Sequence, residues 1–264
     1  MSTIVIIAAA IVGGTGIFIG LFLGFAGKAF AIKTDPKEEA ILEVLPGNNC
    51  GGCGYAGCAA LAKAIAKGEA PCGQCPVGGD DVGAKVAAIM GIQATKSAKK
   101  VATVKCLGSC DHTTNSYNYD GVETCKSAAY MQNKGPKSCQ YGCMGFGDCM
   151  RVCDFHAINI VNGIAVIDWM QCRGCGKCVD TCPRGIIELV TPKKPEKSKV
   201  MCNSNDSGKL VRQICDFGCI GCGACARVCE YDAIKIENNL AHIDPEKCVG
   251  CKKCRTACPR GVIK

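Results

Sequence analysis

The sequence is poor in aromatic residues and histidine, and it lacks the motifs that mark several classes of enzyme. Phe, Trp and Tyr make up 5% of the chain, and there are three histidines. So few aromatic side chains disfavour one large core and favour several small units stapled by metal. No glycine-rich dinucleotide fingerprint, phosphate loop or nucleophile–base pair is visible. Hydride chemistry and hydrolysis by the chain itself are therefore not expected.

Charge is absent from residues 4–27, an uncharged run of 24 residues that can cross a bilayer as one helix. The basic segment that precedes the apolar run of a cleaved signal peptide is also missing. Lys28, Lys33 and Lys37 all follow the run, which places the rest of the chain in the cytoplasm by the positive-inside tendency. We predict a single-pass protein of the cell membrane, with a transmembrane helix at 1–27 and a cytoplasmic C-terminal body.

Within this predicted helix, Gly16, Gly20 and Gly24 recur every four residues and share one face. Small residues at this spacing allow another helix to approach closely. The run contains no carboxylate, histidine or lysine of the kind that lines an ion path. The helix is therefore expected to be an anchor and a docking face rather than an ion conduit.

Cysteine, in contrast, is abundant, with 26 in 264 residues. Such a content indicates either a disulfide scaffold outside the cell or metal ligation in a reducing compartment. The repeated spacing C-x2-C-x2-C-x3-C favours metal, and it is typical of bacterial ferredoxins with two [4Fe–4S] clusters. Zinc ribbons pair two C-x2-C motifs and have no use for a third evenly spaced cysteine.

Two regular runs of this spacing lie near the C-terminus. In two-cluster ferredoxins the fourth cysteine of each run ligates the cluster of the other run. The predicted ligand sets are therefore Cys219, Cys222, Cys225 with Cys258, and Cys229 with Cys248, Cys251, Cys254.

The same module occurs upstream, displaced by 76 positions, but Phe146 stands where the counterpart of Cys222 belongs. Cys139 lies four residues before Cys143 and is predicted to replace the missing ligand. The two sets predicted for this module are Cys139, Cys143, Cys149 and Cys182, and Cys153, Cys172, Cys175 and Cys178.

A third group of cysteines lies between the apolar run and the modules. Cys50, Cys53 and Cys58 are separated by two and four residues among glycines that allow tight wrapping around a cofactor. Helices are expected at 59–67 and 81–92. Cys75 is the predicted fourth ligand, with Cys72 as the second choice, and a structural zinc site is the alternative to an iron–sulfur cluster.

The formal charge of +8 counts every cysteine as neutral. An oxidised [4Fe–4S] cluster with four thiolates carries about −2, so five clusters would leave the protein mildly acidic. A nucleic-acid partner is therefore not expected.

Six cysteines stay outside these five sets. Cys106, Cys110 and Cys125 lie together in a polar stretch and supply either three ligands of a further site or reduced structural thiols. The complete remainder is Cys72, Cys106, Cys110, Cys125, Cys202 and Cys215.

The order of these parts resembles the iron–sulfur subunit of the Rnf complex, the ion-translocating ferredoxin:NAD oxidoreductase. The segment LPGNNCGGCGYAGC…CPVGG carries the resemblance, together with the apolar helix before it and the ferredoxin modules after it. The resemblance implies that Cys50, Cys53, Cys58 and Cys75 bind one [4Fe–4S] cluster. It also implies soluble ferredoxin as the electron donor, and other Rnf subunits that carry flavin, NAD and the ion path of a translocase.

The predicted fold class is α+β, with a transmembrane helix, a small helical [4Fe–4S] domain and two tandem ferredoxin-like modules. A membrane-tethered polyferredoxin, or an electron-transfer subunit of another redox complex, is the alternative function. The predicted boundaries are 1–27 for the helix, 28–92 for the [4Fe–4S] domain, 93–134 for a connecting region, 135–190 for the first module, 191–212 for a linker and 213–264 for the second module.

Overall fold

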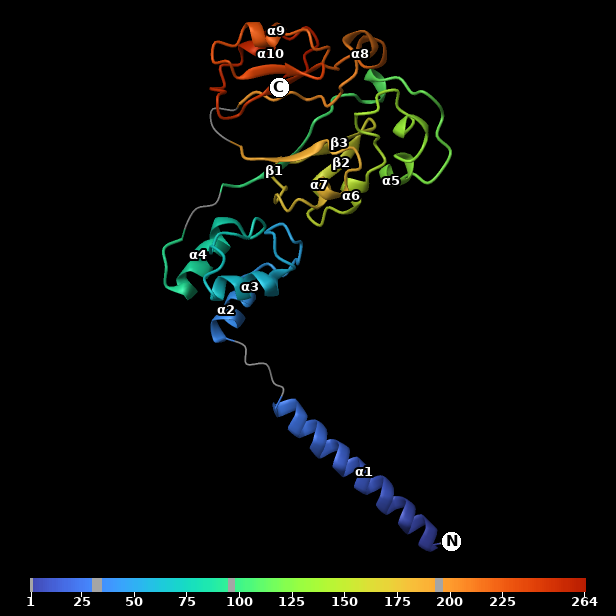
Figure 1. Cartoon of the computed structure of the whole chain (residues 1–264), viewed down its shortest axis with the longest axis vertical. Helices are drawn as coiled ribbons and strands as arrows, with labels where there is room; N and C mark the ends of the chain where they lie inside the picture. Colours follow the sequence, from blue (N-terminus) through green and yellow to red (C-terminus); the bar gives the residue numbers. More distant parts are fainter. Residues whose placement is uncertain (1, 30–34, 95–97, 193–196) are drawn as a thin grey trace.

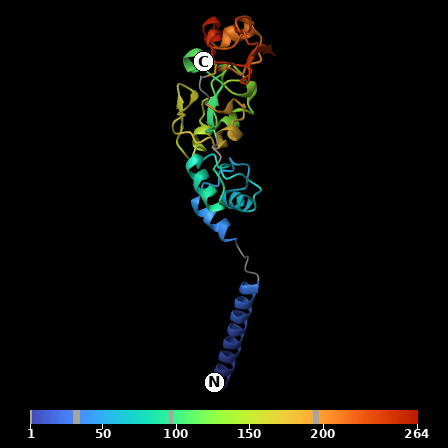
Figure 2. The same ribbon diagram turned by 90° about the vertical axis from the view of Figure 1, so that its left-hand side faces the viewer.

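The computed structural model describes residues 2–29, 35–94, 98–192 and 197–264. It follows one direction from the N-terminal helix α1 (Ser2–Ala29), through a small helical body, to two modules of short strands and helices. Figures 1 and 2 show this succession from two sides. Parts of the predicted connecting region (95–97) and linker (193–196) lie outside the described residues.

α1 carries exposed apolar side chains, including Ile11, Phe18, Phe22 and Phe25. The side chains of residues 2, 4, 5, 8–10, 28 and 29 lie outside the described part. Across the part of the chain that is described, no helix meets the length and apolarity required of a membrane span.

The helical body, residues 35–94, contains α2 (Pro36–Val44), α3 (Cys58–Ala66) and α4 (Gly79–Met90). Asp35 caps α2 by accepting a hydrogen bond from the Lys37 amide at 2.9 Å, with proline as the first helical residue. Gly91 ends α4 in the left-handed conformation. The body packs around a core that includes Ile41, Leu61, Ile65 and Val86. The helices predicted at 59–67 and 81–92 are confirmed with slightly shifted ends.

The first module, residues 98–192, includes a strand from the predicted connecting region. β1 (Val101–Val104) pairs antiparallel with β4 (Ile187–Val190), at the other end of the module. β2 (Ile158–Val161) and β3 (Ile164–Ile167) form a hairpin around Asn162 and Gly163, both with positive φ as a type I′ turn requires. The other elements are the helices α5 (Cys125–Ala128), α6 (Asp148–Arg151) and α7 (Lys177–Thr181), and the 3-10 turns η1 (Cys110–His112) and η2 (Gln132–Lys134).

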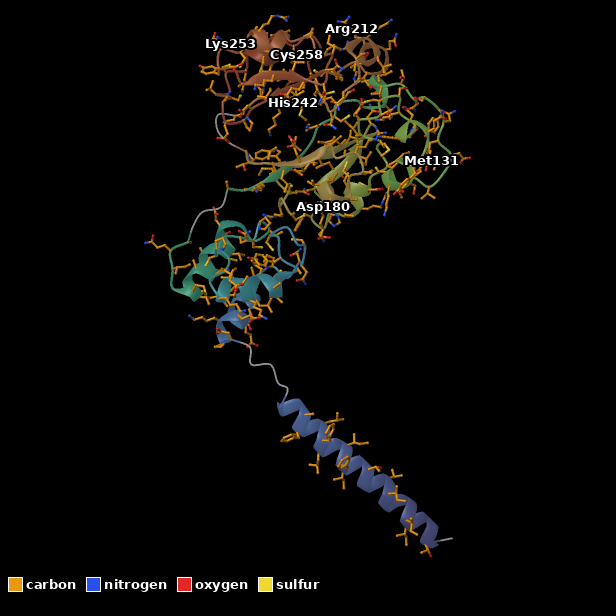
Figure 3. All side chains as sticks on the ribbon, viewed as in Figure 1. Met131, Asp180, Arg212, His242, Lys253 and Cys258 are labelled. Carbon is orange, nitrogen blue, oxygen red and sulfur yellow. The ribbon has the colours of Figure 1, made fainter. Side chains whose placement is uncertain are left out.

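The second module, residues 197–264, repeats this plan with α8 (Gly208–Ile214), α9 (Ala224–Arg227), β5 (Ile234–Glu237), β6 (Leu240–Ile243) and α10 (Lys253–Ala257). α8 begins inside the region predicted to be a linker. The two modules join by a short antiparallel pairing, in which Thr113 forms a bridge with Cys215. Figure 3 places Asp180 of α7 in the first module and Cys258 in the second.

Candidate iron–sulfur sites

Two cavities of the second module are each lined by four cysteines, and each foursome is one of the sets predicted from spacing. Cys229, Cys248, Cys251 and Cys254 line the outer site, beside Tyr231, Ile234 and Ile243. Cys219, Cys222, Cys225 and Cys258 line the inner site, beside Ile236, Val262 and Ile263. The empty volumes of the two cavities are about 340 and 320 Å³. Their similar size and apolar walls suit two cofactors of one kind.

The pKa of the Cys225 thiol in the inner site is raised to about 11, mainly by burial and also by the neighbouring thiols of Cys219 and Cys258. Buried thiols crowded in this way cannot all ionise unless a cation compensates them. Iron supplies that compensation when it replaces the thiol protons. The raised pKa therefore fits a ligand cluster better than a set of independent structural thiols.

In the first module the structure brings together Cys153, Cys172, Cys175 and Cys178, as the spacing predicts; we term this the first module's outer site. The pKa of Cys178 is raised to about 12, mainly by burial and also by the thiols of Cys175, Cys172 and Cys153. The amide of Ala102 in β1 donates a hydrogen bond to the Cys172 sulfur at 3.4 Å. Such a bond stabilises a ligand thiolate.

At the inner site of the first module, the structure places Cys125 near Cys143 and Cys149, where the spacing predicts Cys139. The pKa of Cys149 is raised to about 12, mainly by burial and then by the nearby thiols of Cys143, Cys125 and Cys182, in that order. The sulfur of Cys125 accepts hydrogen bonds from the backbone of Asp148 and Phe146. Cys125, the first residue of the short helix α5, thus places its sulfur near Phe146, the position at which the first module lacks the counterpart of Cys222.

Cys139 lies elsewhere than the spacing predicts. A Cβ added at Gly142 would lie 3.3 Å from the Cys106 sulfur and 3.5 Å from the Cys139 sulfur. Cys139 also lines a cavity with Cys106 and Cys215, between the two modules. The structure therefore places Cys139 with cysteines that the spacing left unassigned.

The helical body brings Cys75 close to Cys53 and Cys58; with Cys50, these form the N-terminal site. Burial raises the pKa of Cys75, and the nearby thiols of Cys58 and Cys53 contribute to that shift. The Gly78 amide donates to the Cys75 sulfur at 3.4 Å. The pKa of Cys72 is raised by burial alone. This geometry favours Cys75 over Cys72 as the fourth ligand.

The N-terminal site and the outer site of the first module touch each other. The thiols of Cys50 and Cys153 both raise the pKa of Cys175, although burial is the larger cause of that shift. A Cβ added at Gly52 would lie only 2.4 Å from the Cys175 carbonyl oxygen. Gly52 is therefore needed for this close approach of two backbones.

In the described part of the chain, no three His, Cys, Asp or Glu side chains lie close enough together to hold a single metal ion. A [4Fe–4S] cluster is larger than one ion and holds its four ligand sulfurs farther apart. The donor sets described above consist of cysteines alone, which is the ligand chemistry of such clusters.

Three family models match parts of the chain. A model described as a putative Fe-S cluster matches residues 45–77, a 4Fe-4S binding domain matches residues 165–188, and a 4Fe-4S dicluster domain matches residues 218–262. These matches cover parts of the helical body, of the first module and of the second module. They support [4Fe–4S] clusters as the cofactors.

Curated relatives match over the whole length. The chain is 41% identical to the subunit designated B in the ion-translocating oxidoreductase complex of Methanosarcina acetivorans, over 100% of this chain and 99% of that protein. It is 43% identical to the subunit of the same designation in the Na(+)-translocating ferredoxin:NAD(+) oxidoreductase complex of Acetobacterium woodii, over 100% of this chain and 78% of that protein. The corresponding protein of the proton-translocating complex of Clostridium ljungdahlii is 40% identical over 94% of this chain and 88% of its own length.

Proposed function

Because the chain belongs to the family of subunits designated B in ion-translocating oxidoreductase complexes, we propose that it relays single electrons from reduced ferredoxin to the membrane subunits of such a complex. The chain is an iron–sulfur electron-transfer subunit. In the complete complex, a flavin- and NAD-binding subunit receives the electrons, and other subunits carry the ion path.

The observation that carries this proposal is the succession of four-cysteine sites along one elongated molecule. The second module, the first module and the helical body follow one another towards α1 (Figure 2), so the sites of the second module would come first in the relay and the N-terminal site last. The contact of Gly52 with the Cys175 carbonyl brings the last two sites together. Electrons then travel from the C-terminal module towards α1.

The outer site of the second module is the proposed place where ferredoxin delivers its electron. Cys251 of this site is exposed, and so is Cys222 of the neighbouring inner site. An exposed ligand brings the cluster edge to the surface, where a soluble protein can reach it.

We expect Cys251→Ala to slow the oxidation of reduced ferredoxin by the full-length protein by at least about tenfold. The experiment mixes reduced ferredoxin with the protein and follows ferredoxin absorbance with time. Cys110→Ala is the matched control, because Cys110 is also exposed but lies outside the five ligand sets. An unchanged rate in Cys251→Ala would place electron input elsewhere and contradict the proposed relay order.

Five [4Fe–4S] clusters are proposed for the sites described above, with Cys125 in place of Cys139 at the inner site of the first module. Cys125→Ala is therefore expected to lower the content by about four iron and four sulfide per chain. The matched rescue is Cys125→Ala combined with Phe146→Cys, which restores the regular spacing and should restore the lost iron. Full iron content in the single variant would show that Cys125 is not a ligand.

α1 is proposed to anchor the protein in the cell membrane as a single-pass helix, with the body in the cytoplasm. The uncharged run 4–27 and the exposed Phe18, Phe22 and Phe25 support this proposal. The same orientation would keep the cysteine-rich body in a reducing compartment, where thiolate ligands persist.

A further inference from the structure

A cavity between the two modules is lined by four cysteines that none of the five proposed clusters uses. They are Cys106, Cys139, Cys202 and Cys215. The empty volume of the cavity is about 460 Å³, compared with about 340 and 320 Å³ for the two sites of the second module. Its other walls include Leu107, Met201, Val211, Ile214 and Phe217. The cavity is therefore large enough for the same cofactor and similarly apolar.

The glycines around this cavity keep the cysteine sulfurs within reach of one another. A Cβ added at Gly108 would lie 3.5 Å from the Cys215 sulfur and 3.7 Å from the Cys106 sulfur. The corresponding point at Gly142 lies between the sulfurs of Cys106 and Cys139. Sulfurs from both modules thus converge on one space.

Cys106 and Cys202 occupy equivalent positions in the two modules. Cys106 follows Val104, the last residue of β1, by two positions. Cys202 likewise follows Val200 by two positions, and Val200 forms an antiparallel bridge with Ile263. Val104 pairs in the same way with Ile187, the first residue of β4. Each module therefore has one cysteine two residues after a valine that pairs antiparallel with an isoleucine near the end of the module.

The hydrogen bonds to these two sulfurs repeat as well. The Cys143 amide donates to the Cys106 sulfur at 3.3 Å, and the Cys219 amide donates to the Cys202 sulfur at 3.4 Å. Cys143 and Cys219 belong to the inner sites of the first and second modules. The cavity thus lies in direct contact with a proposed cluster ligand on each side.

Cys139 and Cys215 form the second equivalent pair. Arg184 donates to the Cys139 carbonyl oxygen at 2.8 Å, and Arg260 donates to the Cys215 carbonyl oxygen. The Nε atoms of both arginines are buried and have no hydrogen-bond acceptor among the described residues. Both arginines thus hold, through its backbone carbonyl, a cysteine that lines the cavity, and Arg260 itself lines the neighbouring inner site of the second module.

A buried cation also faces the cavity. Lys137 is 4% exposed and lines the cavity wall. Its amino group donates to the carbonyl oxygens of Gly108 at 2.9 Å and Gly163 at 2.8 Å. The neutral carbonyl groups do not compensate the positive charge of the buried Lys137 amino group, so the cavity beside it favours an anionic occupant. A [4Fe–4S] cluster with four thiolates is such an anion.

We propose that Cys106, Cys139, Cys202 and Cys215 hold a sixth [4Fe–4S] cluster that bridges the two modules. Its place in the relay rests on the function proposed above, whereas its existence does not. In the relay, the inner cluster of the second module is oxidised by one electron as the bridging cluster is reduced. The bridging cluster is then reoxidised as the inner cluster of the first module takes up that electron.

Iron and sulfide analysis of the reconstituted full-length protein tests the proposal. We expect about 24 iron and 24 sulfide per chain, and about 20 of each in the double variant Cys106→Ala/Cys202→Ala. Cys72→Ala and Cys110→Ala are the matched controls, because these cysteines belong to none of the six sites, and both should keep about 24. The double variant should still be reduced by ferredoxin at its C-terminal clusters but should pass electrons to the N-terminal site at least about tenfold more slowly.

About 20 iron in the wild-type protein, or zinc bound without sulfide at these four cysteines, would overturn the sixth cluster. The wild-type count decides even if the double variant does not fold. A wild-type protein with about 20 iron that still oxidises ferredoxin would leave the proposed function standing. A protein with about 24 iron that ferredoxin cannot reduce would instead contradict the proposed function and keep the cluster.

Discussion

Replacing Cys53 with alanine is expected to slow electron transfer from the chain to its partner subunits by at least about a hundredfold. The C-terminal clusters should still be reduced by ferredoxin at the normal rate. The reason is the position of the N-terminal site, which is the last cluster of the proposed relay. Its loss would block the exit of electrons to the partner subunits but leave the entry of electrons at the second module intact. Absorbance changes of the clusters and NADH formation by the assembled complex measure the two steps separately.

The variant Gly52→Val tests the contact between the helical body and the first module without removing a proposed cluster ligand. A side chain at this position clashes with the Cys175 carbonyl, so the helical body must move away from the first module. We expect full iron content and slowed transfer. Gly68→Ala is the control for a side chain added to the helical body, because nothing lies within 4 Å of the Cβ added at Gly68. Normal transfer in Gly52→Val would contradict the proposed path through the contact between Gly52 and Cys175.

The second module shows how much can be predicted when ligand spacing is regular. Its cysteines lie on short turns and on the helices α9 and α10, so the regular spacing of the two runs, with the fourth ligands exchanged, predicts which sulfurs converge. The two predicted foursomes each line one cavity. The helices α3 and α4 are predictable for a similar reason, because helix periodicity is a local signal.

The first module, in which Phe146 interrupts the regular cysteine spacing, shows where spacing no longer predicts the ligands. The alignment of the modules pairs Cys139 with Cys215, and the structure places both in the cavity between the modules. The proposed replacement for the sulfur missing at Phe146 is Cys125, which a long loop brings back to this position. Loop closure of this kind depends on tertiary packing and leaves no fixed spacing in the sequence. One local pattern does mark Cys106 and Cys202 as equivalent cysteines of the two modules, because a valine stands two residues before each of them.

The strand β1 illustrates the same limit. It consists of four residues, and its partner β4 lies more than eighty positions away. No local pattern specifies such a pairing, so the sequence predicts only a connection there. The pairing nevertheless matters for the sites, because β1 positions Cys106 and supplies the amide that contacts Cys172.

Removal of the clusters from the full-length protein by a chelator and an oxidant is expected to unfold both modules. Each of their three two-stranded sheets has strands of only four residues, and an isolated hairpin of that kind is marginal in water. Many of the buried residues in the modules are themselves the proposed ligands. In small metal-stapled domains, metal binding contributes on the order of 10 kcal/mol, which matches the whole stability of a typical domain.

Circular dichroism and limited proteolysis measure this loss. Strand signal should disappear and residues 98–264 should become accessible to protease, whereas α1 should keep its helix because its hydrogen bonds are internal. Reconstitution with iron and sulfide should restore both properties, which separates unfolding from irreversible damage. Modules that stay protected without iron would show that protein packing alone specifies them. The ligand sets would then be preformed pockets, and the raised thiol pKa of Cys149 and Cys178 would describe a stable site awaiting its cluster.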